Sequence, residues 1–554
     1  MDSIANGSQQ TTRVARWLLV ALSAIPLAVQ LAGLLTPGYG YFIDEFYYFA
    51  CAARPAFGYV DHPPLAPWIL ALTRPVLGDS LLGLRLVAFL AGSATVWVTC
   101  LLVGRLGGGW FATVLAGITV GLAPLVLAMS GFYSMNAFEP LFWMMIVLTV
   151  VRIVQTGESR SWVAVGLLVG LSFENKHTAM VYVVALGLGL LATRTRRILF
   201  DRWLWAGAGL ALLVALPNIW WQVANGFPSL EFYRNAHFLK NVPSPPLRSL
   251  ASLALAMNPV ALPVWIAGFA FLLDPRMPKR RNASAISGSS AEGATMAGAI
   301  EGHALPELRL EALGRRDGKV FRFLGVTCVL LLAAHVASQT SRPDRVTGMF
   351  PILLSAGAVF TERLMKSRTG RAALVGAAAA TGLALAPMVV PLLSPSALAP
   401  YAAALGTNQS AERGKTSPIP QLLADRTGWE SYVDDVERVY KSLSPEDRQR
   451  AIIYAPSYGQ AGAIELLGPA RGLPRVIGTQ NTYWHWSAGH TNTEVLIAVD
   501  ASAKRLRSLF RDVRVAGLVE CDYCMSWRNH LEILVARGSI APMESTWARL
   551  RHYE

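Results

Sequence analysis

The sequence predicts a mainly α-helical, polytopic membrane protein with about eleven transmembrane helices and a C-terminal extracytoplasmic α/β domain. Of its 554 residues, 53% are hydrophobic and only 15% are charged, whereas soluble domains carry about 25% charged residues. The apolar residues are gathered into long runs, and most lysine and arginine residues lie between those runs. The last part of the chain, 394–554, is more polar.

The first apolar run, 17–36, contains twenty residues and no charge. This length crosses a hydrocarbon core about 30 Å thick. No good cleavage site follows it, so we expect a retained transmembrane helix and not a signal peptide. Further apolar runs lie near 81–104, 110–128, 137–154, 162–174, 178–192, 203–222, 250–273, 321–339, 346–360 and 372–393.

The net charge is +14, and the distribution of the basic residues indicates the membrane topology. Basic residues occur in every second loop, a pattern that indicates loops on the cytoplasmic side. We therefore expect a cytoplasmic N-terminus and an external C-terminal domain. No basic helix, zinc finger or aromatic RNA-binding motif accompanies the charge, which argues against a nucleic-acid partner. The basic loops contain Arg105 and the segments 152–160, 194–202, 277–322 and 363–371.

The chain divides into a transmembrane domain, 1–393, and an extracytoplasmic domain, 394–554. In the second domain, 451–456, 493–499 and 531–538 are expected to be strands, while 429–443 and 503–510 are expected to be helices. The segment 282–318 is rich in alanine, glycine and serine. We expect it to form a disordered cytoplasmic loop, because it has few large apolar side chains to bury.

The first outer loop, about 37–80, gathers acids, aromatics and a histidine beside the membrane. Asp44 and Glu45 are adjacent, so on a helix they point about 100° apart. One can act as a base while a partner holds the other, or both can be solvated loop residues. Asp61 and His62 precede two prolines that stiffen the backbone. This pair is suited to a metal or a phosphate, although taken alone it is more typical of an ordinary turn with a surface histidine.

Several stretches along the chain carry a resemblance to a known family. The ordered set resembles the bacterial branch of glycosyltransferase family 39, which includes protein O-mannosyltransferases and the lipid A aminoarabinose transferase and has the GT-C membrane fold. The matching stretches are IDEFYYFA, GYVDHPPLAPW, GDSLLGLRLVAFLAG, FYSMNAFEPLFW, FENKHTAM, PNIWWQVANGFPSLEFYRNAH, GMFPILLSAGAVF, YGQAGAIELLGPARGLP and NTYWHWSAG.

The resemblance implies a mannosyltransferase-like enzyme of the cell envelope, in the bacterial inner membrane. Such an enzyme moves a sugar from a polyprenyl-phosphate donor to a hydroxyl of a lipid, glycan or protein acceptor at the outer face, with inversion. The donor is already activated, so no nucleotide cofactor is expected, and no glycine-rich phosphate loop is evident in the sequence. Asp44 matches the proposed catalytic base of the family.

Other site residues follow from the same resemblance. Glu45 stands beside the base, and Glu139 occupies the second-loop position where relatives usually have aspartate. Lys176 matches a lysine of the lipid-binding cleft. With His62, Arg342 and Arg345, it is expected to contact the lipid phosphate, where cations stabilise the departing negative charge.

This chain departs from the family after Arg342-Pro343, where Asp344-Arg345 replaces two tyrosines of many relatives. The departure puts the carrier or sugar contacts of this loop in doubt.

Asp61 and His237 match the two positions that hold zinc in the aminoarabinose transferase. Carboxylate oxygen and imidazole nitrogen suit zinc, although two ligands do not make a complete site. The alternative is that both side chains are direct hydrogen-bonding partners of the substrate or of the loop.

A different class of function, a flippase for lipid-linked sugars or another transporter, also suits a polytopic protein. A transporter is expected to contain inverted repeats and ionisable groups near the bilayer midplane. We detect no repeat, and the acids described above are expected at the outer surface.

Overall fold

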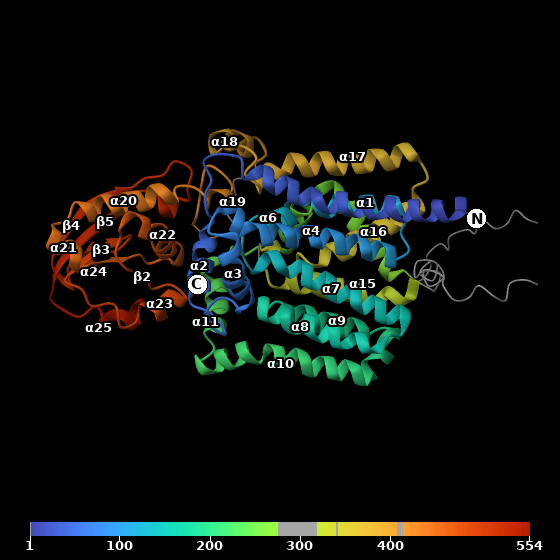
Figure 1. Cartoon of the computed structure of the whole chain (residues 1–554), viewed down its shortest axis with the longest axis horizontal. Helices are drawn as coiled ribbons and strands as arrows, with labels where there is room; N and C mark the ends of the chain where they lie inside the picture. The colour runs from blue at the N-terminus through green and yellow to red at the C-terminus, as the bar shows by residue number, and fades with distance from the viewer. Residues whose placement is uncertain (1, 275–317, 340–341, 407–411, 413) are drawn as a thin grey trace, which may run out of the picture.

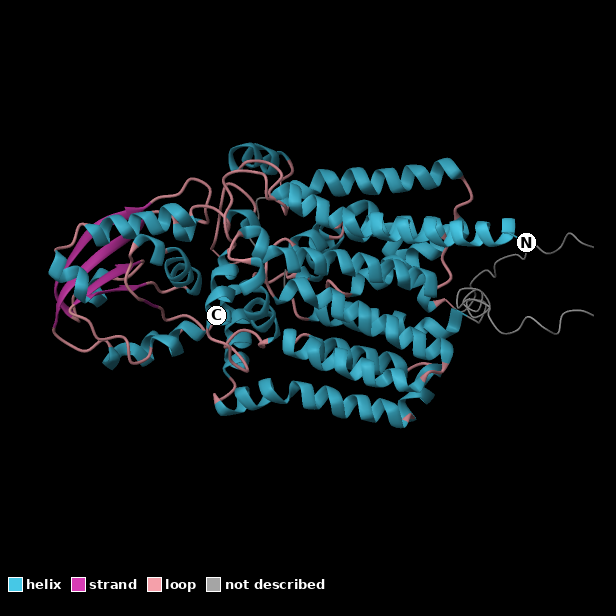
Figure 2. Cartoon of the chain, viewed as in Figure 1, coloured by secondary structure: helices cyan, strands magenta, loops and turns pink. Residues whose placement is uncertain are grey.

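The computed structural model describes residues 2–274, 318–339, 342–406, 412 and 414–554. The predicted disordered loop, 282–318, lies outside these residues except for its last position. A bundle of long helices forms one half of the molecule, with the N-terminus at its far end, and the C-terminal domain covers the opposite end (Figure 1). The strands are confined to the C-terminal domain (Figure 2).

The bundle is built from apolar helices that run roughly side by side (Figure 1). Five of its helices are long and apolar enough to cross a membrane, or up to eight spans if each of three bent helix pairs is one span, among the described residues. The bundle helices are α1 (Asp2–Gly33), α4 (Leu81–Arg105), α5 (Trp110–Gly121), α6 (Pro124–Ser130), α7 (Met135–Thr156), α8 (Trp162–Asn175), α9 (Ala179–Leu191), α10 (Arg202–Ala224), α12 (Pro246–Ala256), α13 (Leu262–Leu273), α15 (Arg322–Ala337), α16 (Met349–Leu364) and α17 (Arg368–Leu385).

These counts differ from the predicted eleven spans because apolar runs are not always straight helices. The run near 110–128 bends by 58° between α5 and α6, where Pro124 begins the second helix. The run near 250–273 bends by 103° between α12 and α13. Others, such as α15, are apolar but shorter than the span length of about 20 residues.

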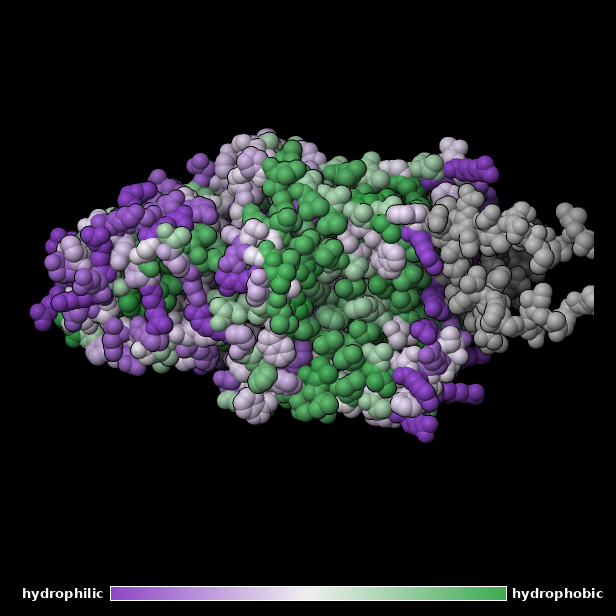
Figure 3. Space-filling view, viewed as in Figure 1, coloured by the Kyte–Doolittle hydropathy of each residue, from purple (hydrophilic) through white to green (hydrophobic). Residues whose placement is uncertain are grey.

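The outside of the bundle is hydrophobic. Figure 3 shows an apolar belt across the face in view, with a hydrophilic rim at the end that carries the N-terminus and a mostly hydrophilic C-terminal domain beyond the other end. Large side chains of α10, among them Trp205, Leu212 and Trp220, are exposed on this belt. A continuous apolar surface of this kind is stable in lipid and not in water. The chain is therefore integral to a membrane.

Short elements lie between the bundle and the C-terminal domain and connect them. The predicted first outer loop, about 37–80, contains α2 and α3, and the start of the predicted polar domain contains α18 and α19. Its elements are α2 (Ile43–Ala53), α3 (Leu65–Leu77), α11 (Pro228–Asn235), the π-helical turn η3 (Ala236–Lys240), the 3-10 turn η6 (Pro343–Val346), α18 (Pro395–Ala404) and α19 (Gln421–Ala424).

The C-terminal domain contains a five-stranded mixed sheet in the order β2-β1-β3-β5-β4. Strands β2, β1 and β3 are parallel, and β5 is antiparallel to both β3 and β4. The strands are β1 (Ala451–Tyr454), β2 (Val476–Ile477), β3 (Val495–Val499), β4 (Phe510–Val519) and β5 (Leu531–Ser539). The helices are α20 (Trp429–Lys441), α21 (Pro445–Arg450), α22 (Tyr458–Leu467), α23 (Thr482–Ser487), α24 (Ala503–Leu506) and α25 (Glu544–Trp547).

Three predicted strands and the predicted helix at 429–443 are confirmed as β1, β3, β5 and α20. The predicted helix at 503–510 is wrong beyond Leu506, because Phe510 pairs with Ser539 and begins β4. The helix in this region is therefore only α24.

Helices α2 and α22 come unusually close to each other, and this contact joins the two halves of the molecule. A Cβ atom at Gly459 would lie 2.2 Å from Ile43 Cγ1, and one at Gly462 would lie 2.8 Å from Phe46 Cβ. Ile43 and Phe46 belong to the same buried cluster as residues of the C-terminal sheet, such as Ile453. The outer loop and the C-terminal domain therefore share one hydrophobic core.

We predict that Gly462→Ala lowers the thermal stability of the detergent-solubilised protein, because the added methyl group must displace α2. Overpacking of a tight core costs about 1–3 kcal/mol, which outweighs the gain of about 1 kcal/mol from replacing a helical glycine. Gly376→Ala in α17 is the control, since a Cβ there meets no atom within 4 Å. Equal melting temperatures for the two variants would contradict this account of the contact.

Candidate active site

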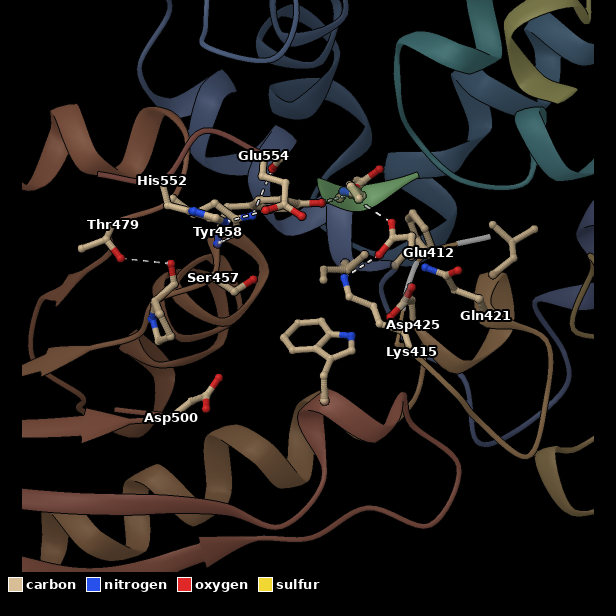
Figure 4. A pocket seen from close by; sticks show the side chains of 18 of the residues that line it. Glu412, Lys415, Gln421, Asp425, Ser457, Tyr458, Thr479, Asp500, His552 and Glu554 are labelled. Atoms are coloured by element: carbon tan, nitrogen blue, oxygen red, sulfur yellow. Dashed lines mark hydrogen bonds and ion pairs between the residues drawn. The ribbon is translucent and has the colours of Figure 1, made fainter. Parts of the chain in front are cut away.

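A cavity of about 970 Å³ lies between the bundle and the C-terminal domain. Residues of both halves line it: Asp44 of α2, Asn136 of α7, Arg342 and Asp344 of η6, and Tyr458 of α22. Figure 4 shows the part of the wall nearest the C-terminal domain, where Tyr458 and Ser457 face Glu412, Lys415 and Asp425 across the space. The cavity thus combines apolar residues of the bundle with several charged groups.

Asp44 lies in the first turn of α2 and lines the cavity. A carboxylate is stabilised at this end of a helix by the backbone N–H groups and the helix dipole. The Tyr458 hydroxyl donates a hydrogen bond of 2.7 Å to Asp44 Oδ1. Burial raises the pKa of Asp44, while the Tyr458 hydrogen bond and Lys240 act in the opposite direction. Asp44 is therefore a carboxylate with raised basicity on the wall of a cavity, as a general base requires.

Glu45 does not share this position, because it does not line the cavity. Its side chain is 0% exposed. Arg85 donates to both carboxylate oxygens, at 2.8 Å to Oε1 and 2.7 Å to Oε2. The backbone N–H groups of Phe42 and Tyr133 donate at 2.7 Å and 2.8 Å. A carboxylate that accepts four hydrogen bonds and has no exposure fixes α2 against its neighbours, and a catalytic role for Glu45 stays a prediction.

Glu139 and Lys176 form a buried ion pair, with 2.7 Å between Glu139 Oε2 and Lys176 Nζ. Lys176 Nζ also donates to Asn136 Oδ1 at 2.8 Å and lies 3.9 Å from Asp344 Oδ2. Thr178 donates to the second oxygen of Glu139. Lys176 and Glu139 do not line the cavity, whereas their neighbours Asn136 and Asp344 do. The pair therefore supports the cavity wall from behind it, and direct contact of Lys176 with a lipid phosphate stays a prediction.

Arg342 lines the cavity, and Asp344 neutralises it. Arg342 Nε lies 2.9 Å from Asp344 Oδ1. Burial alone would raise the pKa of Asp344, but Arg342 and Lys176 hold that pKa well below its usual range. Arg345 is half-buried on the same turn and does not line the cavity. The aspartate that replaces an expected tyrosine is thus the direct partner of Arg342.

His62 is buried and does not line the cavity, and its assignment as a phosphate ligand stays a prediction. Its ring stacks on Tyr48 with 4.8 Å between the ring centroids. One ring nitrogen lies 2.9 Å from the Pro63 carbonyl oxygen, and the other lies 3.9 Å from Cys51 Sγ. Neither nitrogen is directed to the cavity, and at 2% exposure the side chain is a packing residue of the outer loop.

The residues expected to bind zinc are Asp61 and His237. Asp61 accepts a hydrogen bond of 2.9 Å from the Tyr47 hydroxyl, and His237 packs edge-on against Phe238. Within the described part of the chain, no group of three or more His, Cys, Asp or Glu side chains is arranged to hold a metal ion. Structural zinc sites have four ligands. Asp61 and His237 supply only two, so they do not form such a site by themselves. Zinc binding stays a prediction.

Sequence reasoning missed Tyr458 and a group of charges around Glu412. Lys240 Nζ lies 3.4 Å from Glu412 Oε1, and Lys415 Nζ lies 2.5 Å from Glu412 Oε2. The two lysines lower the pKa of Glu412 to about 2, although burial opposes them. All three side chains line the cavity. The only signal in the sequence for Tyr458 was its place in a stretch that matches the family. That match does not show that Tyr458 contacts Asp44.

We predict that Arg85→Met destabilises the protein strongly, because it leaves Glu45 buried without its cationic partner. The removal of one member of a buried pair costs about 3–5 kcal/mol. The control is Arg152→Met, since Arg152 pairs with Glu158 at the surface, where both side chains are about half exposed, and such pairs contribute less than about 1 kcal/mol. Thermal melting in detergent compares them, and a wild-type melting temperature for Arg85→Met would refute the anchoring role of Glu45.

Comparison with known proteins supports this architecture. Residues 61–221 match the family model described as dolichyl-phosphate-mannose-protein mannosyltransferase. This segment includes Asp61, Glu139 and Lys176, while Asp44 precedes it.

A lipid A galacturonosyltransferase of Rhizobium johnstonii is 28% identical over 188 residues, which are 33% of this chain and 38% of the relative. An undecaprenyl phosphate-α-4-amino-4-deoxy-L-arabinose arabinosyl transferase of Pseudomonas fluorescens is 22% identical over 243 residues, which are 40% of this chain and 42% of the relative. The matches thus span less than half of the length of these relatives.

The fold is similar over nearly the whole chain to that of ArnT from Cupriavidus metallidurans. The apo structure of that protein aligns with a TM-score of 0.54 and 14% identity, over 94% of this chain and 98% of the other. The structure bound to undecaprenyl phosphate aligns with a TM-score of 0.55, also at 14% identity, over 93% and 97% of the two chains. The chain is therefore an integral membrane protein of the GT-C fold, similar to glycosyltransferase family 39.

Proposed function

We propose that this protein is a glycosyltransferase that moves a sugar from a polyprenyl-phosphate donor to a hydroxyl of an acceptor, with inversion at the anomeric carbon. The acceptor is a lipid, glycan or protein. The relatives are transferases by name, and one solved structure of the similar fold holds undecaprenyl phosphate. The single observation that carries the proposal is the position of Asp44 on the wall of the cavity, with one oxygen held by Tyr458.

The proposed reaction is a direct displacement. Asp44 removes the proton of the acceptor hydroxyl, the acceptor oxygen attacks the anomeric carbon, and the bond from this carbon to the phosphate oxygen breaks. Two conditions favour the first step: a carboxylate of raised basicity, and burial that limits competition by water. The product is a glycoside, and the other product is polyprenyl phosphate.

The departing phosphate gathers negative charge, and cations near the cavity stabilise it. Arg342 is the arginine of the η6 turn that lines the cavity. Lys176 acts through Asn136 and Asp344, which it holds at the wall. Because Asp344 offsets the charge of Arg342, the phosphate and Asp344 compete for the same guanidinium group. Zinc at Asp61 and His237 is not assigned a step in this mechanism.

The protein is proposed to lie in the inner membrane of a bacterium, with the N-terminus in the cytoplasm and the C-terminal domain outside. The alternation of basic loops supports this orientation. It puts the cavity at the outer face, where a polyprenyl-phosphate sugar can enter from the membrane and an acceptor can enter beneath the C-terminal domain.

We predict that Asp44→Asn lowers turnover at least about a hundredfold while the melting temperature is unchanged, because it removes the general base. The assay measures release of polyprenyl phosphate from a polyprenyl-phosphate sugar in the presence of acceptor. Asp522→Asn is the control, since Asp522 is exposed and lies outside this cavity. Wild-type turnover in a folded Asp44→Asn protein would remove Asp44 from the mechanism. Transport of intact donor without release of phosphate would favour a flippase.

The orientation makes a separate prediction. In a background without the five native cysteines, Ser290→Cys should react with a membrane-impermeant maleimide only from the cytoplasmic side. Glu446→Cys, on the exposed helix α21, should react only from outside. Labelling of both sites from the same side would overturn the argument from the basic loops.

A further inference from the structure

Tyr458 is the first residue of α22, and the local sequence fixes its place. Ser457 caps the helix, and Gln460 completes a capping box in which its side chain accepts from the Ser457 N–H at 3.2 Å. This arrangement satisfies two N–H groups that otherwise lack partners at a helix start. The backbone N–H of Tyr458 donates to Gln480 Oε1 at 3.1 Å. The Cα of Tyr458 is therefore held by α22 and by the loop before α23.

The side chain of Tyr458 reaches from the C-terminal domain to α2. Its ring packs against Tyr47, with 5.1 Å between the ring centroids. Its hydroxyl group donates to Asp44 Oδ1 at 2.7 Å. Tyr47 is itself fully buried, with its hydroxyl 2.6 Å from Thr482 Oγ1. The Tyr458 hydroxyl is thus directed at Asp44 by groups that belong to both halves of the molecule.

We propose that Tyr458 is a positioning residue for the catalytic base, so that the C-terminal domain completes the active site. Its hydroxyl holds Oδ1 of Asp44 and leaves Oδ2 to receive the proton of the acceptor. Among the described residues, no hydrogen bond reaches Oδ2. This inference rests on the proposed function, because it assumes that Asp44 is the base.

The hydrogen bond also changes the acidity of Asp44. Burial is the largest influence and raises the pKa, and the hydrogen bond from Tyr458 is the largest influence that lowers it. Of the charged groups around Asp44, Lys240 lowers its pKa, whereas Asp61 and Glu412 raise it. Arg342 and Asp425 also interact with Asp44. Without the Tyr458 hydroxyl, the pKa of Asp44 rises, and the base becomes protonated at a higher pH.

The test is Tyr458→Phe, which keeps the ring and removes only the hydroxyl group. We expect kcat to fall about tenfold with KM within twofold, because the base is less well oriented in the transition state. We also expect the acid limb of the kcat/KM profile to move up by about one pH unit. A general base must be deprotonated, so a raised pKa shifts that limb to higher pH.

The matched control is Tyr432→Phe. Tyr432 is a buried tyrosine of the same domain that does not line the cavity, and its hydroxyl has no hydrogen-bond partner within the described part of the chain. We expect this variant to keep the wild-type kcat and pH profile. The melting temperature of both variants is measured in parallel, so that a loss of folding is seen separately.

Two results would overturn the inference while the proposed function stands. One is a wild-type rate and pH profile for Tyr458→Phe when Asp44→Asn is inactive. The other is complete loss of activity at every pH in a folded Tyr458→Phe protein, which would make the hydroxyl itself a reacting group. Full activity of a folded Asp44→Asn protein would instead remove Asp44 from the mechanism, and failure of the wild-type protein to release polyprenyl phosphate would refute the proposed function itself.

Discussion

The buried ion pair between Glu45 and Arg85 is the interaction on which the rest of the site depends. It joins α2 to α4 at a place where neither side chain is more than 2% exposed. Adjacent residues on a helix point about 100° apart. Arg85 and two backbone N–H groups fix Glu45 and so set the rotation of α2 about its axis. In this orientation, the side chain of Asp44 lies on the cavity wall. The two acids therefore differ in position: Glu45 is a buried structural anchor, and Asp44 lines the cavity. An isolated carboxylate in this position would cost several kcal/mol, so the arginine is needed for the helix to be placed there at all.

The second constraint is the close packing of α22 on α2. Gly459 and Gly462 leave no room for side chains, and the two helices share one core with the C-terminal sheet. This contact brings Tyr458 within hydrogen-bonding distance of Asp44. It also makes the cavity an interface between domains, where ligand sites are common. The chemistry of the proposed reaction thus depends on a helix from the membrane domain and a helix from the C-terminal domain.

Sequence patterns predicted the class of fold and much of the C-terminal domain, because long apolar runs and short β-branched runs are local signals. Strand β2 has only two residues and gives no such signal. The apparent helix at 503–510 was shortened by a pairing between Phe510 and Ser539, which is not visible locally. In the site, the family resemblance singled out Asp44 as the base, but the adjacent residues alone could not show which of the two acids is held by a partner. That distinction requires Arg85, which lies 40 residues away from Glu45. The sequence did not show that His62 is buried against Tyr48, because a histidine beside two prolines gives no sign of its burial.

The separation of Asp44 and Tyr458 by 414 positions has a consequence for biogenesis. During synthesis, α2 leaves the ribosome long before α22 is made, so the outer loop must wait for its packing partner with Ile43 and Phe46 uncovered. A nascent or truncated chain that ends before α22 has Asp44 but lacks the group that orients it. Insertion into the membrane and acquisition of activity are therefore separate events. Incomplete chains expose apolar side chains during the interval between these events. Quality-control proteases that recognise such side chains can remove the chains in that interval.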